Sequence, residues 1–239
     1  NVNAKLDSDK NLIITATDVS KDMKIDREKW KGMIKSLGGE TGGNDINWEN
    51  ADVKDINFQT DDIYLPNDSS KFFSHFKERI NGSDKLKTDD VVDMSGMFRG
   101  AKRVTPDVSK WNTSNVVNMK DMFNGAKYSI PDGDDWDVSK VKTMKNMFRG
   151  AISFNQPLNK WNVSEVIDMS EMFEAAYKFN QALNSWDVSN VKDMSYMFNN
   201  AKVFNKPLDN WNVSNVEDMS HMFSNAKKFN QPINSWNVS

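Results

Sequence analysis

The strongest constraint on the fold of this chain is a repeat of 25 residues. Met, Phe and Ala recur at this interval in separate columns, and so does Trp, at Trp111, Trp136, Trp161, Trp186, Trp211 and Trp236. Agreement at so many positions in phase excludes chance, so the chain from about Leu86 onward is a repeat protein. Units of this length bury their apolar residues by stacking on one another, which predicts an elongated coil.

Two periods inside one unit predict its local structure. Trp186 and Val188 alternate with polar residues, as in a strand. Apolar residues then recur at the i, i+3, i+4 and i+7 positions of a helix face, namely Met194, Met197, Phe198 and Ala201. We therefore expect an α/β fold of strand-helix units with a parallel sheet and right-handed connections. The Met and Trp columns are interpreted as core, in preference to a cofactor box or a sugar platform.

The start and the end of the chain differ from the regular units. Residues 1–60 predict an N-terminal αβ cap, with Asp26 as N-cap of a helix that ends near Gly38. Residues 61–85 predict a degenerate first repeat, because Phe73 lies 25 residues before Phe98. Residues 86–239 predict the regular stack, open at its C-terminal edge. We expect that edge to self-associate or to be covered by further chain.

Composition limits the classes of function. The net charge is −3 and no basic stripe stands out, which argues against a nucleic-acid partner. Without Cys there is no disulfide and no thiolate metal site, and no apolar run is long enough to span a membrane. We expect no catalytic residues, no cofactor and no metal. The acidic loop from Asp132 to Asp137 is interpreted as a solvated turn, with calcium binding as the alternative.

The pattern W-[DN]-V-S-x-V-x-x-M-x-x-M-F-x-x-A-x-x-F-N-x-P-L resembles the BspA-like repeat of bacterial surface proteins, which is common in mycoplasma lipoproteins. The stretch from Leu65 to Ala101 resembles the entry segment of that family, and the unit after Ala126 departs from the pattern. The resemblance implies a leucine-rich-repeat-like solenoid, export to the cell surface, and often a lipid anchor on an N-terminal Cys. It implies adhesion or host contact and carries no catalytic residues.

These observations predict a non-enzymatic, surface-displayed module that binds protein or matrix ligands. Its partners would be surface proteins of a host or a neighbouring cell, and membrane contact would come only through an N-terminal lipid anchor outside these residues. The alternatives are a carbohydrate-binding module, or a passive stalk or targeting appendage of a larger protein. Fold alone does not decide between them.

Two faces of the predicted stack qualify as a binding surface. The first is the sheet face, preferred because parallel strands align their side chains, with the residues Lys110, Asn112, Asp137, Lys160, Asn162, Ser185, Asp187, Asn210 and Asn212. The second is the helix face, with Asp121, Asn146, Glu171, Tyr196 and His221.

Overall fold

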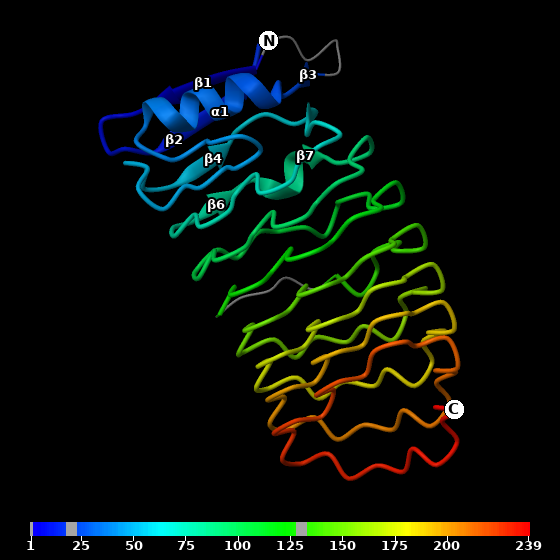
Figure 1. The fold of residues 1–239 in the computed structure, drawn as a ribbon. Coiled ribbons are helices and arrows are strands. Elements are labelled where there is room, and N and C mark those ends of the chain that lie inside the picture. Colours follow the sequence, from blue (N-terminus) through cyan, green and yellow to red (C-terminus); the bar gives the residue numbers. More distant parts are fainter. Residues whose placement is uncertain (1, 18–22, 128–132) are drawn as a thin grey trace.

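The computed structural model describes residues 2–17, 23–127 and 133–239. Its helix and most of its strands lie in the N-terminal part, and the rest of the chain runs in successive coils stacked one upon another (Figure 1). The N-terminal part lies at one end of the stack, and the C-terminal coils lie at the other.

Two small sheets form the N-terminal part. The first has the order β1-β2-β4-β6, in which β1 is antiparallel to β2 and the other pairs are parallel. Its strands are β1 (Val2–Leu6), β2 (Leu12–Ala16), β4 (Ile56–Phe58) and β6 (Ile80–Asn81). The second sheet is parallel throughout and contains β3 (Met23–Lys24), β5 (Ile63–Tyr64) and β7 (Leu86–Lys87). A short 3-10 helix, η1 (Ser83–Lys85), precedes β7.

Helix α1 (Arg27–Ser36) covers the start of the stack. The Asp26 carboxylate accepts a hydrogen bond from the Lys29 backbone N–H at 2.9 Å, which confirms the predicted N-cap. The Trp30 ring of α1 stacks on Phe72, with 4.5 Å between the ring centroids. The helix therefore buries its apolar face against the first aromatic residues of the coil.

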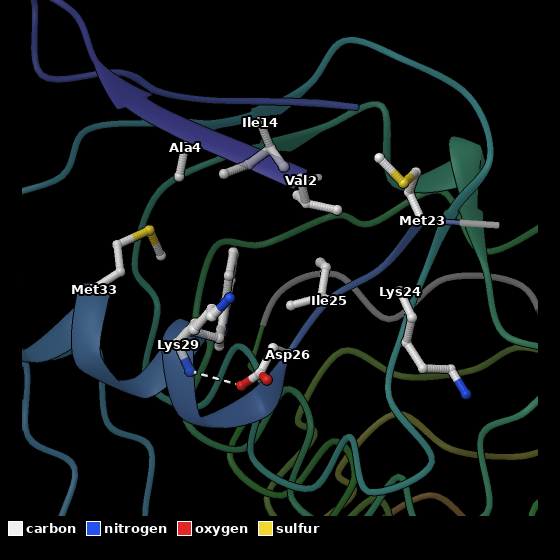
Figure 2. A pocket seen from close by; sticks show the side chains of 10 residues that line it. Val2, Ala4, Ile14, Met23, Lys24, Ile25, Asp26, Lys29 and Met33 are labelled. Atoms are coloured by element: carbon white, nitrogen blue, oxygen red, sulfur yellow. Dashed lines mark hydrogen bonds between the residues drawn. The ribbon is translucent and has the colours of Figure 1, made fainter. Parts of the chain in front are cut away.

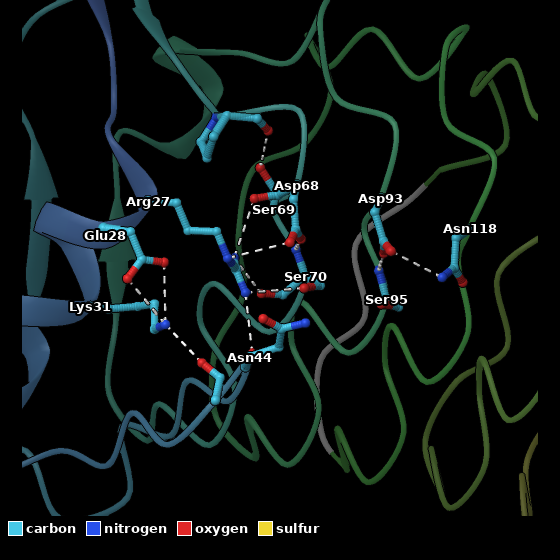
Figure 3. Close-up of polar contacts among 12 residues, drawn as sticks. Arg27, Glu28, Lys31, Asn44, Asp68, Ser69, Ser70, Asp93, Ser95 and Asn118 are labelled. Carbon is cyan, nitrogen blue, oxygen red and sulfur yellow. Dashed lines mark hydrogen bonds and ion pairs between the residues drawn. The ribbon is translucent and has the colours of Figure 1, made fainter.

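A basic side chain joins the N-terminal part to the stack. The Arg27 guanidinium donates to the Ser70 carbonyl oxygen at 2.9 Å and to the Ser70 hydroxyl at 3.1 Å (Figure 3). In the next coil, the Asn118 amide donates to the Asp93 carboxylate at 3.1 Å. Arg27 also pairs with the Asp68 carboxylate at 3.4 Å. Because Asp68, Asp93 and Asn118 occupy one column, Arg27 anchors the first residue of a row that continues along the stack.

The coils pair in parallel through one row of residues. Isolated parallel bridges join residues 25 positions apart, from Asp68 with Asp93 to Asp193 with Asp218. Beyond each bridge, alternate backbone N–H groups donate to the following coil, so Phe198 bonds to the Met222 carbonyl at 2.9 Å. The backbone N–H groups between them close turns within their own coil, as the Met197 N–H does by donating to the Met194 carbonyl at 3.2 Å. Alternation of these two bonds satisfies the backbone without a helix.

The helix predicted in each repeat is not formed, and within the described residues the only α-helix is α1. Tyr196 and Asn200 have positive φ values of 56° and 58°, which break the helical path every fourth residue. The resulting chain of turns still points Met194, Met197 and Phe198 inward. Their spacing therefore fits both structures, and we call this segment, with its equivalents in the other coils, the turn row.

The strand predicted at Trp186 and Val188 is also displaced. The Trp186 backbone N–H closes a turn on the Leu183 carbonyl at 3.1 Å, and the parallel bridge forms later, at Asp193. Trp186 and Val188 are nevertheless buried, because the irregular segment that carries them faces the core.

Stacked rings fill the interior. Phe173 and Phe198 lie 5.6 Å apart between ring centroids, and Trp186 and Trp211 lie 6.4 Å apart. Met194 is fully buried and Trp186 is 2 % exposed. The interpretation of the Met and Trp columns as core is therefore confirmed.

Candidate binding surfaces

All residues predicted for the sheet face are exposed, but they lie in turns and irregular segments and not on a sheet. Their Asn and Asp side chains cap the backbone two residues onward, as Asp187 does for the Ser189 N–H at 3.0 Å and Asn162 for the Ser164 N–H at 3.1 Å. The same bond forms at Asn112, Asp137 and Asn212. The constancy of this column therefore follows from turn geometry.

The other predicted residues of this face make contacts between coils. Lys110 pairs with Asp84 at 3.1 Å, and Lys160 pairs with Asp135 at 2.7 Å. These carboxylates raise the pKa of both lysines by accepting a hydrogen bond and by their negative charge. Ser185 donates to the Asn159 carbonyl at 3.1 Å, and the Asn210 N–H donates to the Asn184 amide oxygen at 3.0 Å. Their polar groups already hold neighbouring coils together.

The predicted helix face is a column of residues in the turn row. Each of its residues has a positive φ, from Asp121 to His221. The Tyr196 ring stacks on His221 with 4.7 Å between centroids, and Glu171 pairs with Arg149 at 3.1 Å. Asn146 is 9 % exposed, and its Oδ1 is buried with no hydrogen-bond partner among the described residues. Backbone conformation constrains this column as well.

The structure exposes a third column, which the sequence interpretation missed and which we call the ladder face. It consists of Val92, Val117, Lys142, Ile167, Lys192 and Glu217. Each backbone N–H from Val117 onward donates to the carbonyl of its equivalent in the preceding coil, for example Ile167 to Lys142 at 2.8 Å. The side chains point to solvent, with Val92 41 % and Ile167 46 % exposed. The ladder face is thus a rigid row of outward side chains.

Charged side chains surround the apolar residues of the ladder face. Lys142 pairs with Glu165, and Lys192 pairs with Glu217 at 2.7 Å. A hollow of about 300 Å³ lies here, lined by Lys142, Glu165, Ile167, Asn190 and Lys192. This arrangement combines an exposed apolar centre with a polar rim, as protein interfaces do.

A signal for the ladder face was present in the sequence. Its residues stand between a Val that recurs in every unit and the Asp, Asn or Thr of the parallel bridge. Flanked by near-constant positions, they change from Val to Lys, Ile and Glu. The sequence alone does not show that these residues form one exposed column, because that depends on the position of the parallel bridge.

A larger cavity of about 470 Å³ lies between β1, β2 and α1 (Figure 2). Val2, Ile14 and Met33 contribute apolar lining. Among its charged residues, Asp26 caps α1, and Lys24 pairs with Asp90 at 2.7 Å. Two of the three charged residues at this cavity, Lys24 and Asp26, therefore have structural partners.

The acidic loop considered for calcium is described only in part. Asp132 lies outside the described residues. Asp134 and Asp135 both pair with Lys160, at 3.4 Å and 2.7 Å, and Asp137 caps the Ser139 N–H. Within the described ranges, no group of three His, Cys, Asp or Glu side chains is placed to hold a metal ion.

The helices of the described residues include none with the length and apolar character to cross a membrane. At the C-terminal end of the stack, Met219, Phe223 and Trp236 are only partly buried, and Val238 is 74 % exposed. The expectation that this edge self-associates stays a prediction.

Comparison with known proteins gives one family. The model of the DUF285 family, described as a Mycoplasma protein of unknown function, matches residues 67–183 and 158–239. No curated protein and no solved structure matches the chain. The two matched segments cover the stacked coils, and the chain therefore belongs to the DUF285 family of Mycoplasma proteins.

Proposed function

We propose that the chain is a non-enzymatic binding module displayed on the cell surface, and that its ladder face holds a protein or matrix ligand. The observation that carries the proposal is the contrast between columns. Core columns keep the same residues from coil to coil, whereas the ladder face changes between Val, Lys, Ile and Glu. Exposed positions on a rigid scaffold are free to vary in this way, and binding residues are often placed on such positions.

The backbone of the ladder face supports this role. Val117, Ile167 and Lys192 are held by inter-coil hydrogen bonds of 2.7 to 2.8 Å. A surface fixed in this way loses little conformational entropy on binding. Val92, Val117 and Ile167 supply exposed apolar area, and the lysines and glutamates beside them supply directional contacts.

Family membership and the repeat pattern support the cellular setting. Membership in a Mycoplasma family agrees with the resemblance to BspA-like repeats of bacterial surface proteins. We accordingly propose display outside the cell, through an N-terminal lipid anchor beyond these residues. The stacked coils would be a right-handed solenoid of the leucine-rich-repeat type. Residues 1–60 would act as its cap, residues 61–85 as its first degenerate unit, and residues 86–239 as its regular part.

The test measures binding of the purified chain to immobilised host matrix and cell-surface proteins by biolayer interferometry. The variant V117D/I167D places carboxylates on the ladder face, and we expect it to weaken binding about tenfold or more. The control is L6D, because Leu6 is 37 % exposed in β1 and lies outside the ladder face. It should bind like the parent chain.

Two results would contradict the proposal. One is a parent chain that binds none of the immobilised proteins, which would favour a passive stalk. The other is an equal loss of binding in L6D and V117D/I167D. Circular dichroism melts establish that both variants fold.

A further inference from the structure

One edge of the stack carries positive charge without any acidic residue. We call it the return-loop edge. It comprises residues 100–106, 125–127, 150–156, 175–181, 200–206 and 225–231, which follow the turn row in each coil. These segments contain no Asp or Glu. Their basic residues are Lys102, Arg103, Lys127, Lys178, Lys202, Lys206, Lys227 and Lys228.

The cations of the return-loop edge have no ion-pair partners among the described residues. The ion pairs lie elsewhere, on lysines such as Lys110, Lys142 and Lys192. All cations of this edge except Lys206 are exposed. Lys202 lies over the Tyr177 ring, 4.1 Å from its centroid. Their positive charge is therefore available to an external ligand.

The coils hold these cations in register. Gly100 donates its N–H to the Asn124 carbonyl at 2.7 Å, and Asn200 donates to the Ser224 carbonyl at 2.8 Å. Lys102, Lys127 and Lys202 each stand two residues after a residue whose N–H donates to the following coil, and Lys227 stands two residues after Asn225, the equivalent position of the last coil. Farther along the loop, the Asn205 N–H donates to the Asn180 amide oxygen at 2.9 Å. Successive loops consequently stack in order.

The spacing between loops follows from the rings behind them. Phe179 and Phe204 lie 6.0 Å apart between centroids, and Phe204 and Phe229 lie equally far apart. From residues 175–181 onward the edge is thus a row of cations that advances by about one ring spacing per coil, whereas residues 150–156 contribute no basic side chain. The net charge of −3 does not reveal the positive charge of this edge, because the acidic residues lie in the other segments of each coil.

We propose that the return-loop edge binds a linear sulfated polysaccharide. The cations of the last three coils, from Lys178 to Lys228, match a chain with regularly spaced sulfates, and each of these coils adds a contact to the same ligand. Single-stranded nucleic acid is favoured less, because its bases stack on free aromatic rings. Tyr177, the exposed aromatic side chain of the described edge, has Lys202 over its ring. The binding surface is separate from the ladder face, so this inference extends the proposed function.

The test uses heparin as the probe and measures Kd by isothermal titration at several salt concentrations. The variant K202Q/K227Q/K228Q should weaken heparin binding about tenfold and flatten the dependence of log Kd on log salt. The control K10Q/K110Q/K160Q removes the same charge from ion-paired lysines that lie outside both proposed surfaces. It should stay within about twofold of the parent chain, since those charges are already neutralised by partners.

Four results would overturn the inference. The parent chain could fail to bind heparin, or the control could lose as much affinity as K202Q/K227Q/K228Q. Desulfated heparin could bind as tightly as heparin. Single-stranded DNA or vesicles of anionic lipid could bind more tightly than heparin, which would assign the edge to another class of partner. The V117D/I167D variant should keep the heparin affinity, so failure here is distinguishable from failure of the ladder-face proposal.

Discussion

The indole Nε1–H of Trp186 donates a hydrogen bond to the Leu158 carbonyl oxygen, 2.9 Å away in the preceding coil. Trp211 makes the equivalent bond to Leu183 at 2.9 Å, and Trp161 bonds to Gly133 at 2.8 Å. The Trp column is therefore both apolar core and a tie between coils. This second role explains why Phe does not replace Trp in any unit.

We predict that W186F destabilises the chain by about 0.5 to 1.5 kcal/mol, because the Leu158 carbonyl loses the indole donor and keeps only the Trp161 backbone N–H, at 3.2 Å. W186A should cost about 3 to 5 kcal/mol, as for other buried aromatic residues. Urea denaturation measures both. The control Y177F removes only a hydroxyl from a partly exposed ring, keeps the ring under Lys202, and should stay within about 0.5 kcal/mol. A W186F variant as stable as the parent would show that the hydrogen bond contributes nothing.

Two glycines in one column predict different tolerance of a methyl group. Gly100 and Gly125 both have positive φ, 66° and 72°, so alanine at either costs about 1 kcal/mol in backbone strain. A Cβ at Gly100 would also clash with Cδ2 of His75, whereas one at Gly125 would meet its nearest atom at 3.8 Å. We expect G100A to be less stable than G125A in thermal melts.

The double variant H75A/G100A isolates the steric part of this effect. Removing the imidazole should bring the cost of G100A, relative to H75A, close to that of G125A. An unchanged cost would mean that His75 is not the obstacle.

The caps of the Asp column predict acid sensitivity. Hydrogen bonds from the Ser189 hydroxyl and from its backbone N–H hold the pKa of Asp187 below its ordinary value of 3.8. A lowered folded pKa stabilises the fold above the unfolded pKa, and this stabilisation is lost as the pH falls through the folded pKa. We therefore expect the Tm to decrease as the pH falls below about 4.

The variant D187N tests this cap. Its amide oxygen can accept the same bond, as Asn162 and Asn212 do in the same column, so the Tm at neutral pH should change little. The decrease of Tm in acid should be smaller than in the parent chain. The control E78Q alters an exposed carboxylate for which no hydrogen bond or ion pair is found among the described residues. Equal acid sensitivity of D187N and the parent would contradict the argument.

The repeat length, the buried columns and α1 could all be predicted from sequence, because each depends on local chemistry or strict periodicity. The turn row could not be, because its apolar spacing suits a helix equally well. A contrary signal lay in the column of Gly100, Gly125, Gly150, Asn200 and Asn225. Gly and Asn are the residues that most readily adopt positive φ, and all of these have it.

The candidate surfaces were harder to predict, because they depend on which residues the coils bring together. Asn162 and Asp187 looked like ligand-binding residues, yet their side chains cap turns. The sequence did not indicate that Ile167 and Lys192 belong to one surface, since only the parallel bridge shows that they form one column. The sequence did not single out Lys202 and Lys227, because basic and acidic residues nearly balance over the repeats. The fold places these lysines and the acidic residues at different edges of the stack.

The most direct test of the stacked-coil account is NMR detection of scalar couplings across hydrogen bonds. The structure places the Phe198 N–H 2.9 Å from the Met222 carbonyl oxygen in the following coil. We predict a correlation between the Phe198 nitrogen and the Met222 carbonyl carbon, with no correlation to Met194. A correlation from Phe198 to the Met194 carbonyl, as in an α-helix, would contradict the turn row and the stacking that depends on it.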